Sequence, residues 1–257
     1  PILTPYVEIP KLGDYKLVEV DVDAKPEQNW QIPQQELDKM LDPKVKAFFL
    51  VNPSNPPSVR LSEGSLLAIA EIVKKRPDLI ILTDDVYGTF AENFASIFAY
   101  CPQNTILVYS FSKYFGATGW RLGLIVTHHD NIMDRGIANL PEENKKALDE
   151  RYASITTDPR KLKFIDRLVA ESRTVALNHT AGLSTPQQGQ MVLFSIFSLM
   201  DEAQNYKKAM KRVISRRMDK LYRETPVRRN AELNSVRCYT LRDIETRRKQ
   251  VQGEGFL

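Results

Sequence analysis

The sequence has few cysteines and no long apolar run. Only two of its 257 residues are cysteines, Cys101 and Cys238, and they lie far apart. Two isolated cysteines provide neither a disulfide framework nor a zinc site, which favours a reducing compartment. No apolar stretch approaches the ~20 residues of a membrane-spanning helix, and no secretory signal opens the chain. We therefore expect a cytoplasmic globular protein without a metal centre.

Acidic residues are scarce near the C-terminus. Residues 206–257 contain 15 Lys and Arg against 6 Asp and Glu, although the whole chain has a net charge of only +4. Such a segment is typical of nucleic-acid binding, or of the solvated face of a helix. No interleaved aromatic residues or nucleic-acid motif accompany it, so we favour the solvated helix and expect no nucleic-acid partner.

Four short apolar runs predict the strands of one sheet. They occupy residues 45–51, 79–83, 105–109 and 122–127. Ser62 is a good N-cap for a helix that Pro77 ends. Apolar runs without alternation indicate strands that are buried on both faces. The sequence therefore predicts an α/β fold with a mainly parallel sheet and helices on both faces.

The remaining segments predict the domain organisation. We expect one large domain over residues 1–200, with a charged helical insert at about 131–172. Residues 188–225 are expected to form one long helix or two joined helices. Residues 201–257 then hold this linking helix and the start of a small α+β domain, with a strand at 236–241 and a helix at 243–252. Both ends have the character of cuts through a longer protein.

Polar clusters directly follow three of the expected strands. They are Asn52–Asn55, Asp84–Tyr87 and Ser110–Lys113. In open α/β sheets, ligands bind outside the carboxyl ends of the strands. The three clusters therefore predict a ligand site at one edge of the sheet.

Lys113 is the most informative residue in these clusters. It follows an apolar run and two serines, and precedes a glycine-bearing loop with an arginine eight positions on. A lysine so placed is suited to hold an aldehyde cofactor as a Schiff base while an arginine binds its phosphate. The pattern indicates a pyridoxal-phosphate enzyme.

The other parts of such a site have candidates in the same clusters. Asp84 is the candidate partner of the protonated ring nitrogen, which makes the ring an electron sink. Asn55 and Tyr87 are candidate donors to its phenolic oxygen. The candidate phosphate ligands are Ser110, Ser112 and Arg121.

The sequence contains four motifs in a fixed order: Asn-Pro-x-Asn-Pro, Asp-x-x-Tyr, Ser-x-Ser-Lys and the later arginine. Together they resemble the motifs of the aspartate aminotransferase superfamily, the fold type I pyridoxal-phosphate enzymes. The resemblance implies that Lys113, Asp84 and Tyr87 are catalytic. It gives the remaining candidates, Ser112 included, the cofactor-binding roles described above. It also implies a homo-oligomer, because a neighbouring subunit completes the site in this superfamily.

Residues 117–123, the insert and residues 175–188 are similar to bacterial L-aspartate 4-decarboxylases. That resemblance implies conversion of L-aspartate to L-alanine and carbon dioxide, with transamination as a side activity. A phosphate loop, a ring-stacking aromatic residue and the arginine for the substrate α-carboxylate have no match in this chain. Two alternatives stay open: an aminotransferase for another amino acid, and an inactive piece of such an enzyme.

Overall fold

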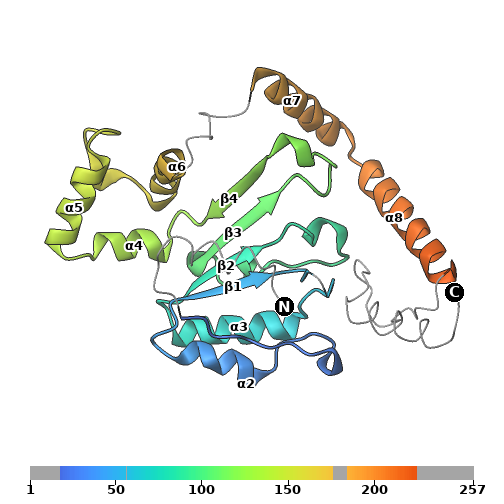
Figure 1. The fold of residues 1–257 in the computed structure, drawn as a ribbon, viewed down its shortest axis with the longest axis horizontal. Coiled ribbons are helices and arrows are strands. Elements are labelled where there is room, and N and C mark those ends of the chain that lie inside the picture. Colours follow the sequence, from blue (N-terminus) through green and yellow to red (C-terminus); the bar gives the residue numbers. More distant parts are fainter. Residues whose placement is uncertain (1–17, 56, 176–183, 225–257) are drawn as a thin grey trace, which may run out of the picture.

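The structure is a computed structural model that describes residues 18–55, 57–175 and 184–224. It is an α/β fold around one four-stranded sheet (Figure 1). The strands are β1 (Ala47–Val51), β2 (Ile80–Asp84), β3 (Thr105–Ser110) and β4 (Gly123–Thr127). The helices are α2 (Gln34–Leu37), α3 (Glu63–Lys75), α4 (Ile132–Ala138), α5 (Glu142–Tyr152), α6 (Phe164–Val175), α7 (Thr185–Met200) and α8 (Asn205–Glu224). Short 3₁₀ turns include Asp38–Leu41, Thr118–Trp120 and Pro159–Lys161.

The sheet is mostly parallel, as predicted. Its order is β1-β2-β3-β4, with β1 and β3 both parallel to β2 and only β4 antiparallel to its neighbour. All four expected strands are present within two residues of their predicted bounds. β4 differs in burial, because Leu124, Ile125 and Val126 are exposed by 38%, 47% and 37%. The prediction that this strand is buried is therefore wrong for the described chain, in which β4 is the last strand at one side of the sheet.

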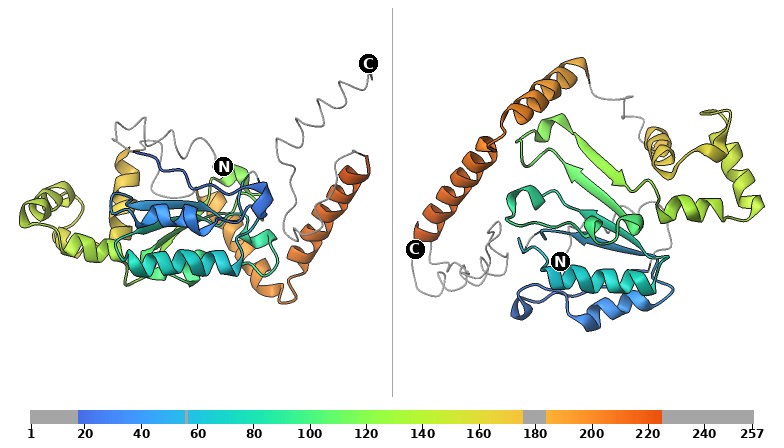
Figure 2. Two further views of the ribbon diagram at one scale, coloured as in Figure 1. Left: turned by 90° about the horizontal axis from the view of Figure 1, so that it is seen from below. Right: turned by 180° about the vertical axis from the view of Figure 1, so that it is seen from behind.

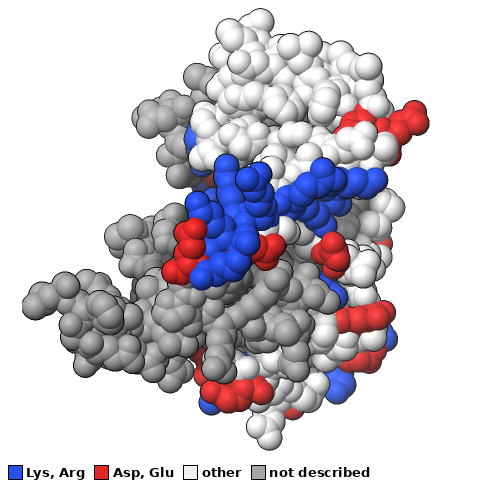
Figure 3. Space-filling view, turned by 90° about the vertical axis from the view of Figure 1, so that its right-hand side faces the viewer, with Lys and Arg blue, Asp and Glu red and all other residues white. Residues whose placement is uncertain are grey.

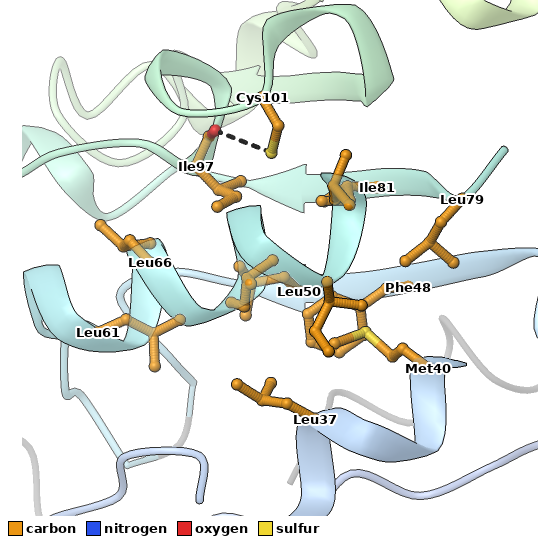
Figure 4. Packing of buried hydrophobic residues seen from close by; sticks show 13 residues of the cluster. Leu37, Met40, Phe48, Leu50, Leu61, Leu66, Leu79, Ile81, Ile97 and Cys101 are labelled. Carbon is orange, nitrogen blue, oxygen red and sulfur yellow. Dashed lines mark hydrogen bonds between the residues drawn. The ribbon is translucent and has the colours of Figure 1, made fainter. Parts of the chain in front are cut away.

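The hydrophobic core lies between the sheet and the helices α2 and α3 (Figure 4). The strands contribute Phe48, Leu50 and Ile81, and α3 contributes residues spaced three or four apart along one face. That face consists of Leu66, Ile69, Ile72 and Val73. Burial of apolar area in this layer is the main force that fixes α3 against β1 and β2.

The two ends of α3 are held by specific polar contacts. At its start, Ser62 accepts a hydrogen bond from the Ser65 N–H at 3.1 Å, the N-cap that the sequence predicted. At its end, buried Arg76 donates to the carbonyl oxygens of Met40 and Val45, both at 2.9 Å. Arg76 thereby joins the end of α3 to the segment that leads into β1.

The later helices lie at opposite ends of the sheet. Figures 1 and 2 show α4, α5 and α6 beyond the end to which β4 runs, and α7 and α8 beyond the other end. The expected helical insert is thus three helices, and the expected linking segment is two helices separated by residues 201–204. The predicted strand at 236–241 and helix at 243–252 lie outside the described residues, and the domain boundary at residue 200 stays a prediction.

Two surface features belong to α7 and α8. No residue of α7 is buried, and Leu193, Leu199 and Met200 are among its strongly exposed apolar side chains. Lys and Arg side chains gather across the face on which α8 lies (Figure 3). The basic residues of α8 therefore lie on a helix surface, as we favoured from the sequence. Among the described helices, none is long and apolar enough to cross a membrane.

The N-cap of α3 gives a first prediction. Ser62→Ala removes the acceptor for the Ser65 N–H and should lower the free energy of unfolding by about 1 kcal/mol. Urea unfolding followed by circular dichroism measures this change. Ser62→Asp keeps a capping oxygen and is the control. Equal losses in the two variants would contradict a capping role.

The ion pair at the other end of α3 gives a pH prediction. A hydrogen bond from Arg76 lowers the pKa of Asp78 to about 2. In the unfolded chain the pKa of Asp78 is ~3.9. The ion pair therefore stabilises the fold above this pH, and the stabilisation is lost as the pH falls towards 2. Asp78→Asn should cost less than about 1 kcal/mol at neutral pH, because half of the Asp78 side chain is exposed. The free energy of unfolding of the parent protein and of Asp78→Asn is measured across the acid range. The difference between the two free energies should narrow as the pH falls.

Candidate active site

The parallel register brings three strand ends to one edge of the sheet. Val51 lies beside Asp84, and Asp84 lies beside Val108. The polar clusters after β1, β2 and β3 therefore begin at the same edge, with Asp84 on the middle strand. This edge faces the side of the molecule that carries α7 and α8 (Figure 1).

Two neighbouring carboxyl groups at the end of β2 have different environments. Asp84 is 9% exposed, and its Oδ1 accepts a hydrogen bond from the Val86 N–H at 3.0 Å. The Asp85 Oδ1 instead accepts a hydrogen bond from the Thr83 hydroxyl at 2.6 Å. Burial raises the pKa of Asp85, although hydrogen bonds from Ser96 and Thr83 oppose the rise. Both residues are buried, and Asp84 is the last residue of β2.

Asn55 and Tyr87 come together from separate loops. The Asn55 Nδ2 donates to the Tyr87 hydroxyl at 3.3 Å, although 32 residues separate the two in the sequence. Both side chains are half-buried. Two neutral donors this close together are able to hold one oxygen of a ligand from two sides.

The candidate phosphate ligands are Ser110 at the end of β3 and two residues of the loop between β3 and β4, Ser112 and Arg121. The Ser110 hydroxyl accepts from the Ser112 N–H at 3.2 Å. The Thr118 hydroxyl donates to the Ser112 carbonyl at 3.0 Å, and the Arg121 guanidinium donates to the Thr118 carbonyl at 3.1 Å. The sequence analysis did not predict a role for Thr118. Only its position between the Ser-x-Ser-Lys motif and Arg121 could have indicated that it belongs to the site.

Aromatic side chains attach this loop to α7 and α8. The ring centroids of Tyr114 and Tyr206 are 5.5 Å apart, and those of Phe115 and Phe194 are 5.4 Å apart. The Tyr206 hydroxyl also donates to the Tyr114 carbonyl at 3.3 Å. Edge-to-face contacts of this kind stabilise beyond the area that they bury. The sequence showed the two aromatic residues after Lys113 but not their partners.

The structure joins some of the candidate residues and leaves others apart. Direct hydrogen bonds connect Asn55 with Tyr87 and Ser110 with Ser112, and Thr118 connects Ser112 with Arg121. Lys113 is exposed in the loop that carries the serines. His179 and its neighbours at residues 176–183 lie outside the described residues. In the described ranges, no group of His, Cys, Asp and Glu is arranged to hold a metal ion.

The donor set fits pyridoxal phosphate. The paired Asn55 and Tyr87 side chains suit a phenolic oxygen, and the carboxyl group of Asp84 suits a pyridinium nitrogen. A guanidinium and two hydroxyls in one loop suit a phosphate. These groups lie at or after the carboxyl ends of β1, β2 and β3, which share one edge of the sheet.

Comparison with known proteins identifies the family of this chain. Residues 4–225 match the family model for aminotransferase class I and II. A Pseudomonas protein named bifunctional aspartate aminotransferase and L-aspartate beta-decarboxylase is 60% identical over the whole of this chain, which covers 48% of that protein. An aspartate/prephenate aminotransferase from Nitrosomonas europaea is 29% identical over 54% of this chain and 38% of its own length. The chain therefore spans about half the length, or less, of these curated relatives.

A solved structure shares the fold over most of the chain. The alanine aminotransferase from Pyrococcus furiosus superposes with a TM-score of 0.61 over 92% of this chain and 51% of its own, at 21% identity. That identity supports the fold alone. With the family model covering most of the sequence and a 60% identical relative matching all of it, the chain belongs to the aminotransferase class I and II family.

Proposed function

We propose that the protein that contains this chain converts L-aspartate to L-alanine and carbon dioxide with pyridoxal phosphate, and transaminates aspartate as a second activity. The observation that carries this proposal is the 60% identity to a Pseudomonas protein named for both activities. The match extends over all 257 residues, so the aligned region includes the three strand-end clusters and the helical insert. An assay that measures alanine and carbon dioxide from L-aspartate tests it.

Each candidate residue has a task in this proposal. Asp84 keeps the ring nitrogen protonated, and Asn55 and Tyr87 donate hydrogen bonds to the phenolic oxygen. When bound, pyridoxal phosphate supplies an electron sink for charge that develops on the substrate. Lys113 holds the cofactor covalently and takes a proton from the substrate Cα after release. The phosphate is held by Ser110, Ser112 and Arg121.

The exposed position of Lys113 is relevant to assembly. A lysine that moves protons at a substrate carbon needs an enclosed site, because excluded water strengthens the electrostatic interactions inside. Lys113 is exposed in the described chain, so further protein must cover it. We propose that this cover comes from the rest of a longer protein and from a second subunit of a homo-oligomer. The exposed apolar side chains of α7 support an assembly.

A second candidate function is transamination of another amino acid. The aspartate/prephenate aminotransferase of Nitrosomonas europaea supports it, because that relative shares the family but not the decarboxylase name. Carbon dioxide release separates the two candidates, since only the first produces it from aspartate. We also propose the cytoplasm as the compartment, because Cys101 is buried and free.

The role of Lys113 gives one prediction. Lys113→Ala removes the amine and should abolish the covalent link to pyridoxal phosphate. The measurement is visible absorption before and after borohydride reduction, with mass mapping of the modified peptide. Lys146→Ala is the matched control, because Lys146 is exposed on α5 at the other end of the sheet. Unchanged trapping in the Lys113 variant would rule out this assignment.

The role of Asp84 gives another prediction. Asp84→Asn should still bind the cofactor but lose roughly 10²-fold or more in turnover, because no anion keeps the ring nitrogen protonated. Asp85→Asn is the matched control, since burial already disfavours the charged form of Asp85. Turnover with aspartate is measured for both variants at equal cofactor occupancy. Near-normal turnover of Asp84→Asn would remove Asp84 from the mechanism.

A further inference from the structure

A charged cavity lies in the helical insert, away from the candidate active site. Its volume is about 460 Å³, and it is bordered by α4, α5, α6 and the turn Pro159–Lys161. Figures 1 and 2 show these helices beyond the end of the sheet opposite to α7 and α8. A cavity of this volume is in the range that binds small organic molecules.

Cationic side chains outnumber acidic ones around the cavity. Five Lys and Arg residues line it, against Asp134 and Asp149. Both acids already have partners within the insert. Asp134 accepts from the Phe164 N–H at 2.7 Å and from Asn131 at 2.8 Å. Asp149 accepts from Arg160 at 2.8 Å, and Arg160 also bonds Glu142.

Arg167 is a buried cation without a counter-charge among the described residues. It lines the cavity, is only 6% exposed, and forms no ion pair with the residues described. Its Nη2 and Nε donate to the carbonyl oxygens of Pro159 and Leu162, at 2.9 and 3.2 Å. Its guanidinium carbon lies 4.7 Å from the centre of the Tyr152 ring. These contacts are all with neutral groups.

One donor of Arg167 is also unused. Among the described residues, the buried Nη1 has no hydrogen-bond partner. A buried donor without an acceptor destabilises a protein, and so does a buried charge without a counter-charge. A bound oxyanion removes both costs at once. Charge-assisted bonds from a guanidinium to such an anion are among the stronger hydrogen bonds in proteins.

The rest of the lining indicates the kind of molecule. Lys145 and Lys163 add positive charge, while Leu148, Leu162 and Ile137 supply an apolar wall. An inorganic ion alone uses little of this volume and none of the apolar surface. We propose that the cavity in the helical insert binds an organic anion, with its phosphate or carboxylate group on Arg167 and its apolar body against Leu148 and Leu162. This site is independent of the proposed aspartate chemistry.

Phenyl phosphate is a suitable probe, since it combines an oxyanion with an apolar ring. Isothermal titration calorimetry with the full-length protein, saturated with pyridoxal phosphate and at constant ionic strength, should show binding, with inorganic phosphate binding more weakly. Arg167→Gln should weaken the binding of phenyl phosphate about tenfold or more, which corresponds to ~1.4 kcal/mol or more. Arg135→Gln makes the same change in charge at an arginine paired with Asp130 outside the cavity lining, and should leave the affinity within about twofold.

Two further variants keep the proposal open to disproof. Ala138→Phe places a large side chain in the cavity from an exposed position and leaves Arg167 unchanged. This variant should not bind phenyl phosphate, and its melting temperature should stay near that of the parent protein. It decides the question if Arg167→Gln does not fold. Arg121→Gln removes the phosphate ligand of the candidate active site and should leave phenyl phosphate binding intact. Loss of binding in Arg121→Gln with retention in Ala138→Phe would overturn the proposal, as would the absence of binding at millimolar phenyl phosphate.

Discussion

The alignment of β1, β2 and β3 is the constraint on which the candidate site depends. Parallel pairing places Val51, Asp84 and Val108 side by side, so three chain segments leave the sheet at one edge. Residues separated by more than fifty positions in the sequence are thereby collected there. The core between the sheet and α3 keeps this alignment fixed, since a shift of one residue would reverse every side chain of a strand.

The loop that carries Lys113 is held from two sides. Hydrogen bonds through Thr118 connect its two ends, and aromatic contacts of Tyr114 and Phe115 attach it to α7 and α8. The lysine itself stays exposed between these anchors. A fixed backbone with a free side chain suits a residue that must first bind a cofactor covalently and later act on a substrate.

The fold places Arg121 and Arg167 far apart. Arg121 belongs to the strand-end loop, whereas Arg167 is buried within the helical insert at the other end of the sheet. Their surroundings differ as well, because Arg121 is exposed, while Arg167 has a buried N–H without an acceptor among the described residues. The two positions therefore allow separate ligands and separate tests.

The sequence by itself determined the strands, the capped helix α3, the parallel character of the sheet and the strand-end clusters. These features depend on local patterns of apolar, capping and turn residues, which can be read along the chain. Only the tertiary structure decided the exposure of β4, the bond between Asn55 and Tyr87, the aromatic anchors of the Lys113 loop and the unpaired donor of Arg167. Each of these depends on which distant side chains meet and what covers them, and no local pattern contains that information.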